Sequence, residues 1–227
     1  MTGVLVVNAG SSSLKLRVLD PADAVTASAD VSPWDGSPDD PGLRGFLDGL
    51  TGIGAAGHRV VHGGHRFTAA TLIDDSVVAG IGELTDLAPL HQPRALAGIE
   101  AVRAALPRLP AVACFDTAFH AGLPAAAAAY AVPAEWTRRF GLRRFGFHGL
   151  SHAYAARRAG AMRADLDAER HRVVTCTSAP GRRSRRSKAA GAWTRPWVSR
   201  RWRGWSWRPG PEPWIRGWSS GCSATAG

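Results

Sequence analysis

Short apolar runs that end in polar turns mark the beginning of the chain. Val4–Val7 is rich in valine and leads into the small polar cluster Asn8–Ser13. Leu14–Leu19 then alternates leucine and valine with basic residues, as a strand with one buried face does. Two such runs around a turn of small residues predict a β-hairpin.

Further apolar runs alternate with helical patterns as far as Cys176. Apolar residues at helical spacing predict two helices, and Ser151 is suitably placed to cap a third that runs to about Met162. A loop rich in Asp, Pro, Gly and Ser is expected at the surface. The alternation indicates an α/β or α+β layered domain. The expected strands are His58–Val61, Ala111–Phe115 and Val173–Cys176, the helices are Asp75–Leu87 and Ala95–Leu106, and the loop is Asp30–Pro41.

The composition changes abruptly after Cys176. The 227 residues have a formal charge of +10, but residues 177–227 hold eleven Lys/Arg and one acidic residue, so the first 176 residues sum to zero. Seven of the nine tryptophans also lie in this tail, and the apolar periodicity stops there. We therefore expect residues 177–227 to be disordered, since they cannot bury a patterned core.

Cysteines and hydropathy exclude several classes of protein. Cys114, Cys176 and Cys222 are far apart and show no C-x-x-C spacing, which argues against a disulfide framework or a zinc site. The first residues do not resemble a signal peptide, and no stretch reaches the roughly 18 apolar residues of a membrane span. We expect a cytoplasmic protein without a membrane partner.

Polar residues at the hairpin turn are the first candidate site. Backbone N–H groups and the hydroxyls of Ser11 and Ser12 could bind an anion, and Lys15 offers a positive charge to a phosphate. Asn8 offers a neutral oxygen to Mg²⁺ or to its waters. The spacing is not that of a Walker A loop, and an ordinary hairpin turn explains the same residues equally well.

Three more candidates follow predicted strands or sit among aromatic residues. Arg59 has the planar fork that binds carboxylate or phosphate, and Asp116 comes directly after a buried strand, where α/β folds place ligand sites. His148 lies between small and aromatic residues. Taken singly, each of these residues also fits a purely structural role.

Five motifs in order give these residues a common meaning. NAGSSSLK, HRVVHGG, APLHQP, FDTAFH and RRFGFHGLSH resemble motifs of the acetate kinases of the acetokinase family, from the first residues to about Cys176. The resemblance implies an α/β domain of the actin/hexokinase/Hsp70-like (ribonuclease H-like) superfamily. It implies an N-terminal domain at residues 1–168 and the start of a second domain at 169–176, with the remainder of that domain missing.

The resemblance also implies an activity and residue roles. The family transfers phosphate between ATP and acetate to give acetyl phosphate and ADP, it requires Mg²⁺, and its members are usually homodimers. The implied roles are Mg²⁺ binding for Asn8, ATP binding for Lys15, Ser11 and Ser12, substrate binding for Arg59 and His91, proton transfer for Asp116 and transition-state stabilisation for His148. Because acetate is already ionised at neutral pH, we expect Asp116 to orient Mg²⁺ or Arg59 instead.

One motif departs from the family pattern. The family usually has PLHNP followed by Asn, whereas this chain has Gln92, Pro93 and Arg94 after His91. These residues are expected to flank the substrate pocket. Propionate or butyrate kinase activity is therefore an alternative to acetate kinase activity.

The tail has an explanation at the level of codons. The family continues with HLGxGAS, DTSMGxTPLEGL and TRSGxxDP, none of which is visible here. If the DNA is read one base earlier, each new codon takes the last base of one visible codon and the first two bases of the next. Because tryptophan has the single codon TGG, three of these new codons are determined. Trp193-Thr194 then encodes aspartate, Trp197-Val198 glycine and Trp214-Ile215 aspartate. These are family residues at family spacing. We therefore expect a frameshift near codon 177, and we expect the chain as written to be catalytically inactive.

A rival hypothesis takes the tail at face value. A basic segment with interleaved tryptophans could bind RNA or single-stranded DNA through phosphate contacts and base stacking. The hidden reading frame argues against nucleic acid as a partner.

Overall fold

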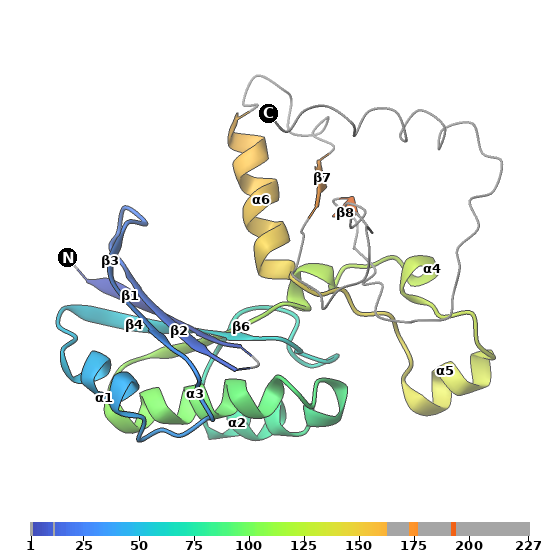
Figure 1. Ribbon diagram of the computed structural model, residues 1–227. Helices are drawn as coiled ribbons and strands as arrows, with labels where there is room; N and C mark the ends of the chain where they lie inside the picture. The colour runs from blue at the N-terminus through green and yellow to red at the C-terminus, as the bar shows by residue number, and fades with distance from the viewer. Residues whose placement is uncertain (1, 11, 163–172, 177–191, 194–227) are drawn as a thin grey trace.

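A six-stranded mixed sheet forms the centre of the part that the computed structural model describes, which is residues 2–10, 12–162, 173–176 and 192–193. The strand order is β3-β2-β1-β4-β6-β5 (Figure 1). β1, β4 and β6 are parallel, so their carboxyl ends lie at one edge of the sheet. The strands are β1 (Gly3–Ala9), β2 (Leu14–Leu19), β3 (Val25–Val31), β4 (Ile53–Val60), β5 (Thr71–Leu72) and β6 (Ala111–Phe115).

The predicted hairpin is confirmed. β1 and β2 form an antiparallel ladder that runs from the pair Val4 and Leu19 to the pair Ala9 and Leu14. The backbone N–H of Gly10 closes the turn by donating to the carbonyl of Ser13 at 2.7 Å. Alternate residues of both strands are buried, as the period of two predicts.

Three helices cover one face of the sheet: α1 (Pro41–Asp48), α2 (Asp75–Gly82) and α3 (Gln92–Ala105) (Figure 1). Because side chains alternate along a strand, Asn8 and Arg59 lie on the opposite face. Val4, on that same opposite face, is 41% exposed. The core under the helices includes Leu5, Val7, Leu14, Leu16, Trp34, Leu43 and Leu47 in one cluster and Val60, Phe67, Val77, Ile81, Ile99 and Phe115 in another.

The structure differs from the sequence predictions in several element boundaries. The expected loop Asp30–Pro41 overlaps β3 at its beginning and α1 at its end. α1 begins at Pro41 because Asp40 caps it by accepting from the N–H groups of Gly42 and Leu43. The helix expected at Asp75–Leu87 is α2 followed by a short 3₁₀ helix, η1 (Thr85–Leu87). Ser151 lies inside its helix and does not cap it.

The remaining elements lead away from the sheet. Beyond β6 the chain forms η2 (Ala118–His120), α4 (Ala125–Ala128), α5 (Ala134–Phe140), α6 (Gly149–Met162), β7 (Val174–Thr175) and β8 (Ala192–Trp193). His152 Nδ1 of α6 lies 2.7 Å from Thr175 Oγ1 of β7, so these two elements are in contact. No helix in the described ranges is long and apolar enough to cross a membrane.

The tail predictions fall mostly outside the described residues. Of residues 177–227, only 192 and 193 are described, and they pair antiparallel with β7. The predicted domain boundary at residue 168 also lies outside the described ranges.

Candidate active site

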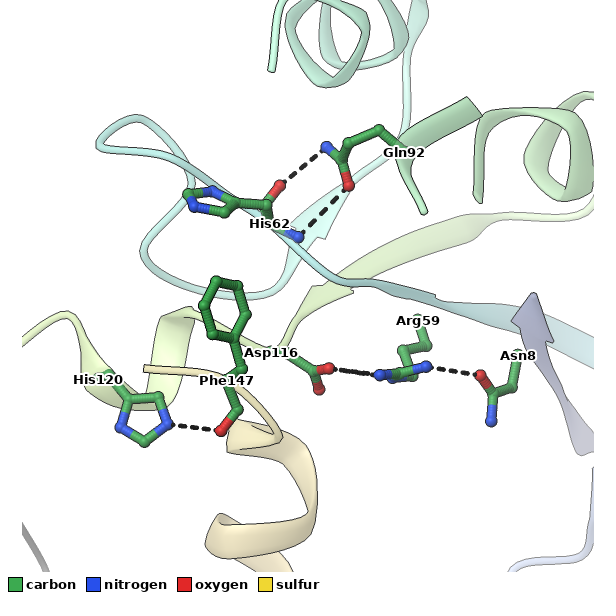
Figure 2. A network of polar contacts seen from close by, with 7 residues as sticks. All are labelled: Asn8, Arg59, His62, Gln92, Asp116, His120 and Phe147. Carbon is green, nitrogen blue, oxygen red and sulfur yellow. Dashed lines mark hydrogen bonds and ion pairs between the residues drawn. The ribbon is translucent and has the colours of Figure 1, made fainter. Parts of the chain in front are cut away.

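The carboxyl edge of the three parallel strands brings together Asn8, Arg59 and Asp116, as Figure 2 shows. Nε and Nη2 of Arg59 donate to Oδ2 of Asp116 at 3.1 and 2.6 Å. Nη1 of Arg59 donates to Oδ1 of Asn8 at 3.1 Å. Three candidates that are up to 108 positions apart in sequence, from Asn8 to Asp116, therefore form one polar group.

Burial differs sharply between the two charges of this group. The Asp116 side chain is 3% exposed, whereas that of Arg59 is 26% exposed. The backbone N–H of Asp116 donates to the carbonyl of Val60 at 2.9 Å, which fixes the residue at the end of β6. The buried carboxylate of Asp116 thus fixes the position of the Arg59 guanidinium and leaves part of it accessible to solvent. An accessible, oriented arginine is suited to binding an anion.

The hairpin residues lie next to this group. Lys15 is the direct partner of Asn8 in the antiparallel ladder, so both side chains are on the face that carries Arg59. Lys15 is exposed. Ser12 is exposed too, and its carbonyl accepts from the N–H of Trp34 at 3.0 Å. Ser11 lies outside the described residues.

The residue after His148 is hydrogen-bonded to the backbone of Asp116. The N–H of Gly149 donates to the carbonyl of Asp116 at 3.1 Å, and His148 has a positive φ of 56°. A Cβ added at Gly149 would lie 2.0 Å from that same carbonyl oxygen, so only glycine permits this approach. The start of α6 is therefore bound to the end of β6.

Gln92 and Arg94, which differ from the family pattern in the third motif, have structural roles. Gln92 is wholly buried at the start of α3, where its amide binds backbone on both sides. Its Oε1 accepts from the N–H of His62 at 3.3 Å, and its Nε2 donates to the carbonyl of His62 at 3.0 Å (Figure 2). The same Nε2 also donates to the carbonyl of Ile81 at 3.3 Å. Arg94 donates to the carbonyl of Trp34. Gln92 therefore acts on the loop after β4.

His91 lies in the turn just before α3. It is half-buried, and its backbone N–H donates to the carbonyl of Ala88 at 2.9 Å. It is thus the immediate neighbour of the buried Gln92.

Two histidines without a predicted role complete the surroundings. The His62 ring is edge-on to Phe145 and Phe147, with ring centroids 4.5 and 5.6 Å apart. Burial, with a smaller effect of His65, lowers the pKa of His62 to about 4. His120 binds the carbonyl of Phe147 through Nε2 at 3.1 Å. Both histidines stand in motifs that the sequence singles out, but a contact with a distant backbone leaves no pattern in the sequence.

Few side chains near Arg59 are suited to binding a metal ion. Within the described ranges there is no cluster of three or more His, Cys, Asp or Glu residues that could hold a metal ion. The oxygen of Asn8 already accepts from Arg59, a cation. Mg²⁺ in proteins commonly takes one or two carboxylates and completes its shell with phosphates and water. The carboxylate at this site is that of Asp116, whose Oδ2 accepts from two nitrogens of Arg59.

Comparisons with known proteins find relatives over much of this chain. The sequence profile of the acetokinase family matches residues 44–181. An acetate kinase of Bacillus mycoides is 53% identical over 116 residues, covering 51% of this chain and 29% of the relative. An acetate kinase of Bacillus cereus is 40% identical over 189 residues, covering 70% of this chain and 48% of the relative.

Solved structures of the same kind are similar in fold. The acetate kinase of Porphyromonas gingivalis has a TM-score of 0.69 and 32% identity over 78% of this chain and 52% of its own. A propionate kinase of Francisella tularensis has a TM-score of 0.67 with the same identity and coverage. The expected fold class is confirmed. The chain spans about half the length of these solved structures and no more than 48% of the two relatives above.

Proposed function

Because this chain belongs to the acetokinase family, we propose that it carries the carboxylate-binding half of a kinase that transfers a phosphoryl group between ATP and acetate. The products are acetyl phosphate and ADP. Substrates of this kind suit a cytoplasmic enzyme, and we propose a homodimer for the intact protein. The observation that carries the proposal is the partly exposed, oriented guanidinium of Arg59.

Arg59 retains the capacity to bind a carboxylate. A guanidinium has five N–H donors. Two donate to Asp116 and one to Asn8, which leaves two for a ligand. A small carboxylate such as acetate can take two parallel N–H donors in the usual fork geometry. The chain therefore offers an acetate site without breaking its own contacts.

Asp116 has a role that does not need proton transfer. Acetate resembles a Glu side chain, whose pKa is about 4.3, and is ionised at neutral pH. Asp116 has no substrate proton to remove, but it holds two nitrogens of Arg59 through one oxygen. We assign it the orientation of Arg59 and, as the available carboxylate, of Mg²⁺.

The other predicted residues have roles in positioning and in charge. Phosphoryl transfer depends mainly on aligning the reactants and neutralising the transferring oxygens. We assign Lys15, on the same sheet face as Arg59, to the nucleotide phosphates, and His148 to the transferring group. A Mg²⁺ ion held at Asp116 would supply positive charge that offsets the charge of the phosphates.

The tail is proposed to be the rest of the same kinase in another reading frame. The family profile ends at residue 181, shortly after the predicted break at codon 177. The aspartate and glycine codons required by Trp193, Trp197 and Trp214 support the same reading. We propose that the 227-residue chain lacks the nucleotide-binding half and is inactive.

Insertion of one base near codon 177 tests both the assigned function and the frameshift. The DNA around codon 177 is sequenced, one base is inserted to give a frame-restored protein, and both proteins are assayed for acetyl phosphate with acetate, ATP and Mg²⁺. We expect formation by the frame-restored protein and none by the 227-residue chain. Folded frame-restored protein without activity would refute the assigned function, and an active 227-residue chain would refute the frameshift.

Two arginines on one sheet face provide a matched pair of variants. Arg59→Gln in the frame-restored protein removes the proposed carboxylate site and is expected to lower kcat/KM for acetate at least 100-fold. Arg17→Gln removes an exposed ion pair with Asp30 and is expected to leave it unchanged. Acetate, propionate and butyrate are compared in the same assay, and the kcat/KM ratios determine the acyl preference.

A further inference from the structure

His148 has a backbone conformation that its own sequence does not favour. Its φ is 56°, in the left-handed region, which non-glycine residues seldom adopt. It follows the irregular segment 141–147 and precedes α6. Such a conformation costs free energy and persists only where neighbouring contacts hold it.

Hydrogen bonds hold the residues on both sides of His148. On one side the N–H of Gly149 donates to the carbonyl of Asp116, and on the other His120 Nε2 meets the carbonyl of Phe147 at 3.1 Å. Both partners come from the short stretch that leaves β6, and Figure 2 shows the contact between His120 and Phe147. The segment around His148 is thus bound twice to the strand that delivers Asp116.

Chemistry fixes the form of the His120 ring. A carbonyl oxygen only accepts, so Nε2 must carry the hydrogen. In the described part of the chain, Nδ1 is buried and has no hydrogen-bond partner. Burial lowers the pKa of His120, and the Phe147 carbonyl opposes this only in part. The ring is therefore neutral at pH 7 and donates a single, directed hydrogen bond.

Close packing fixes the ring's orientation. A Cβ added at Gly146 would lie 2.3 Å from Cγ of His120, so the backbone of that segment touches the imidazole face. The rings of Phe119 and His152 lie edge-on to it, with centroids 5.1 and 5.9 Å away. The donor cannot turn away from Phe147 without repacking these groups.

We propose that His120 is a positioning residue, which through the Phe147 carbonyl holds His148 in its left-handed conformation and so aims that side chain at the transferring phosphoryl group. The direction of the His148 side chain towards the phosphoryl group rests on the proposed function. Since Arg59 is held by Asn8 and Asp116, His120 affects the chemical step and not the binding of acetate.

The first test needs neither a variant nor activity. Long-range ¹H–¹⁵N NMR spectra of the labelled 227-residue chain at pH 7.5 report which nitrogen of each imidazole is protonated. We expect the Nε2–H tautomer for His120. The Nδ1–H tautomer would overturn the proposal, because Nε2 could then not donate to Phe147.

Two substitutions separate the hydrogen bond from the packing. His120→Phe keeps a ring but removes the donor, and His120→Gln keeps an N–H group near the position of Nε2. We expect the His148 ring resonances to shift in His120→Phe and to return towards the parent in His120→Gln. His65→Phe is the matched control, because His65 Nε2 also meets a carbonyl of the same segment, Gly141 at 3.3 Å. Unshifted His148 resonances in His120→Phe would overturn the proposal.

The frame-restored protein tests the functional part. We expect His120→Phe to lower kcat about 10- to 100-fold, the size of effect that a displacement of about 1 Å has, with KM for acetate within about twofold. His120→Gln is expected to recover most of kcat. A raised KM at unchanged kcat would overturn the proposal. If the parent is inactive while both NMR results hold, the proposed function fails and the positioning of His148 stands.

Discussion

Acidification from pH 7 to pH 5 is expected to destabilise the fold through the buried His58. Its side chain is 2% exposed, and neither ring nitrogen has a hydrogen-bond partner in the described residues. Burial lowers its pKa from 6.5 to about 4. The folded state therefore favours the neutral ring, and stability that is fully present above pH 6.5 is lost as the pH falls towards 4.

The magnitude follows from the two pKa values. With 6.5 for the unfolded chain and about 4 for the folded protein, linkage gives a total loss of about 3 kcal/mol from His58. About 2 kcal/mol of this loss falls between pH 7 and pH 5. Set against a typical stability of about 5–15 kcal/mol, that is a large fraction.

The assay is urea denaturation followed by far-UV circular dichroism at pH 7, 6 and 5. His58→Leu removes the titrating group at similar volume, so its free energy of unfolding is expected to fall by about 2 kcal/mol less than that of the parent over this range. Val60→Ala is the control. Val60 is buried two residues further along the same strand and does not titrate, so this variant is expected to be less stable at every pH while keeping the parent's pH dependence. Equal losses in His58→Leu and the parent would refute the reasoning.

Three further substitutions and one control variant test the site and its supports. Asp116→Asn in the frame-restored protein is expected to lower kcat/KM for acetate about 100-fold and to alter the Mg²⁺ requirement, since the buried carboxylate is lost. An unchanged Mg²⁺ requirement with a lost pH dependence would contradict this role. Gly149→Ala would place a Cβ 2.0 Å from a carbonyl oxygen, and we expect a loss of about 3 kcal/mol in urea denaturation. Gly122→Ala, with nothing within 4 Å, is expected to change stability by less than about 0.5 kcal/mol. Gln92→Leu would leave the N–H and carbonyl of His62 without their partner, and a loss of about 3 kcal/mol is expected in the same measurement.

The elements that could be predicted from sequence are those with a clear apolar pattern. Leu14–Leu19 alternates along β2, β1 and β6 contain short apolar runs, and the apolar residues of α2 and α3 recur at helical spacing. The position of Asp116 after β6 follows from the same pattern. β3 was not predicted, because its small and polar residues bury little surface and depend on pairing with β2. α1 was not predicted, because Pro41 indicates a loop until Asp40 is seen to cap a helix.

The candidate site could be predicted only in part. Motif order predicted Asn8, Arg59 and Asp116, and the parallel strands bring them together. The role of Gln92 could not be predicted, because a substituted residue near a site looks like a pocket residue until its burial is known. The contact from His120 to Phe147 joins a side chain to a backbone 27 positions away, and any residue at position 147 would supply the same carbonyl.

Asp116 belongs to two sets of contacts at once. Its carboxylate holds Arg59, and its carbonyl receives the N–H of Gly149 at the start of α6. The carboxylate contact depends on this particular side chain, whereas the carbonyl contact is available from any amino acid at position 116. A substitution at position 116 can therefore release Arg59 while leaving in place the carbonyl that binds α6.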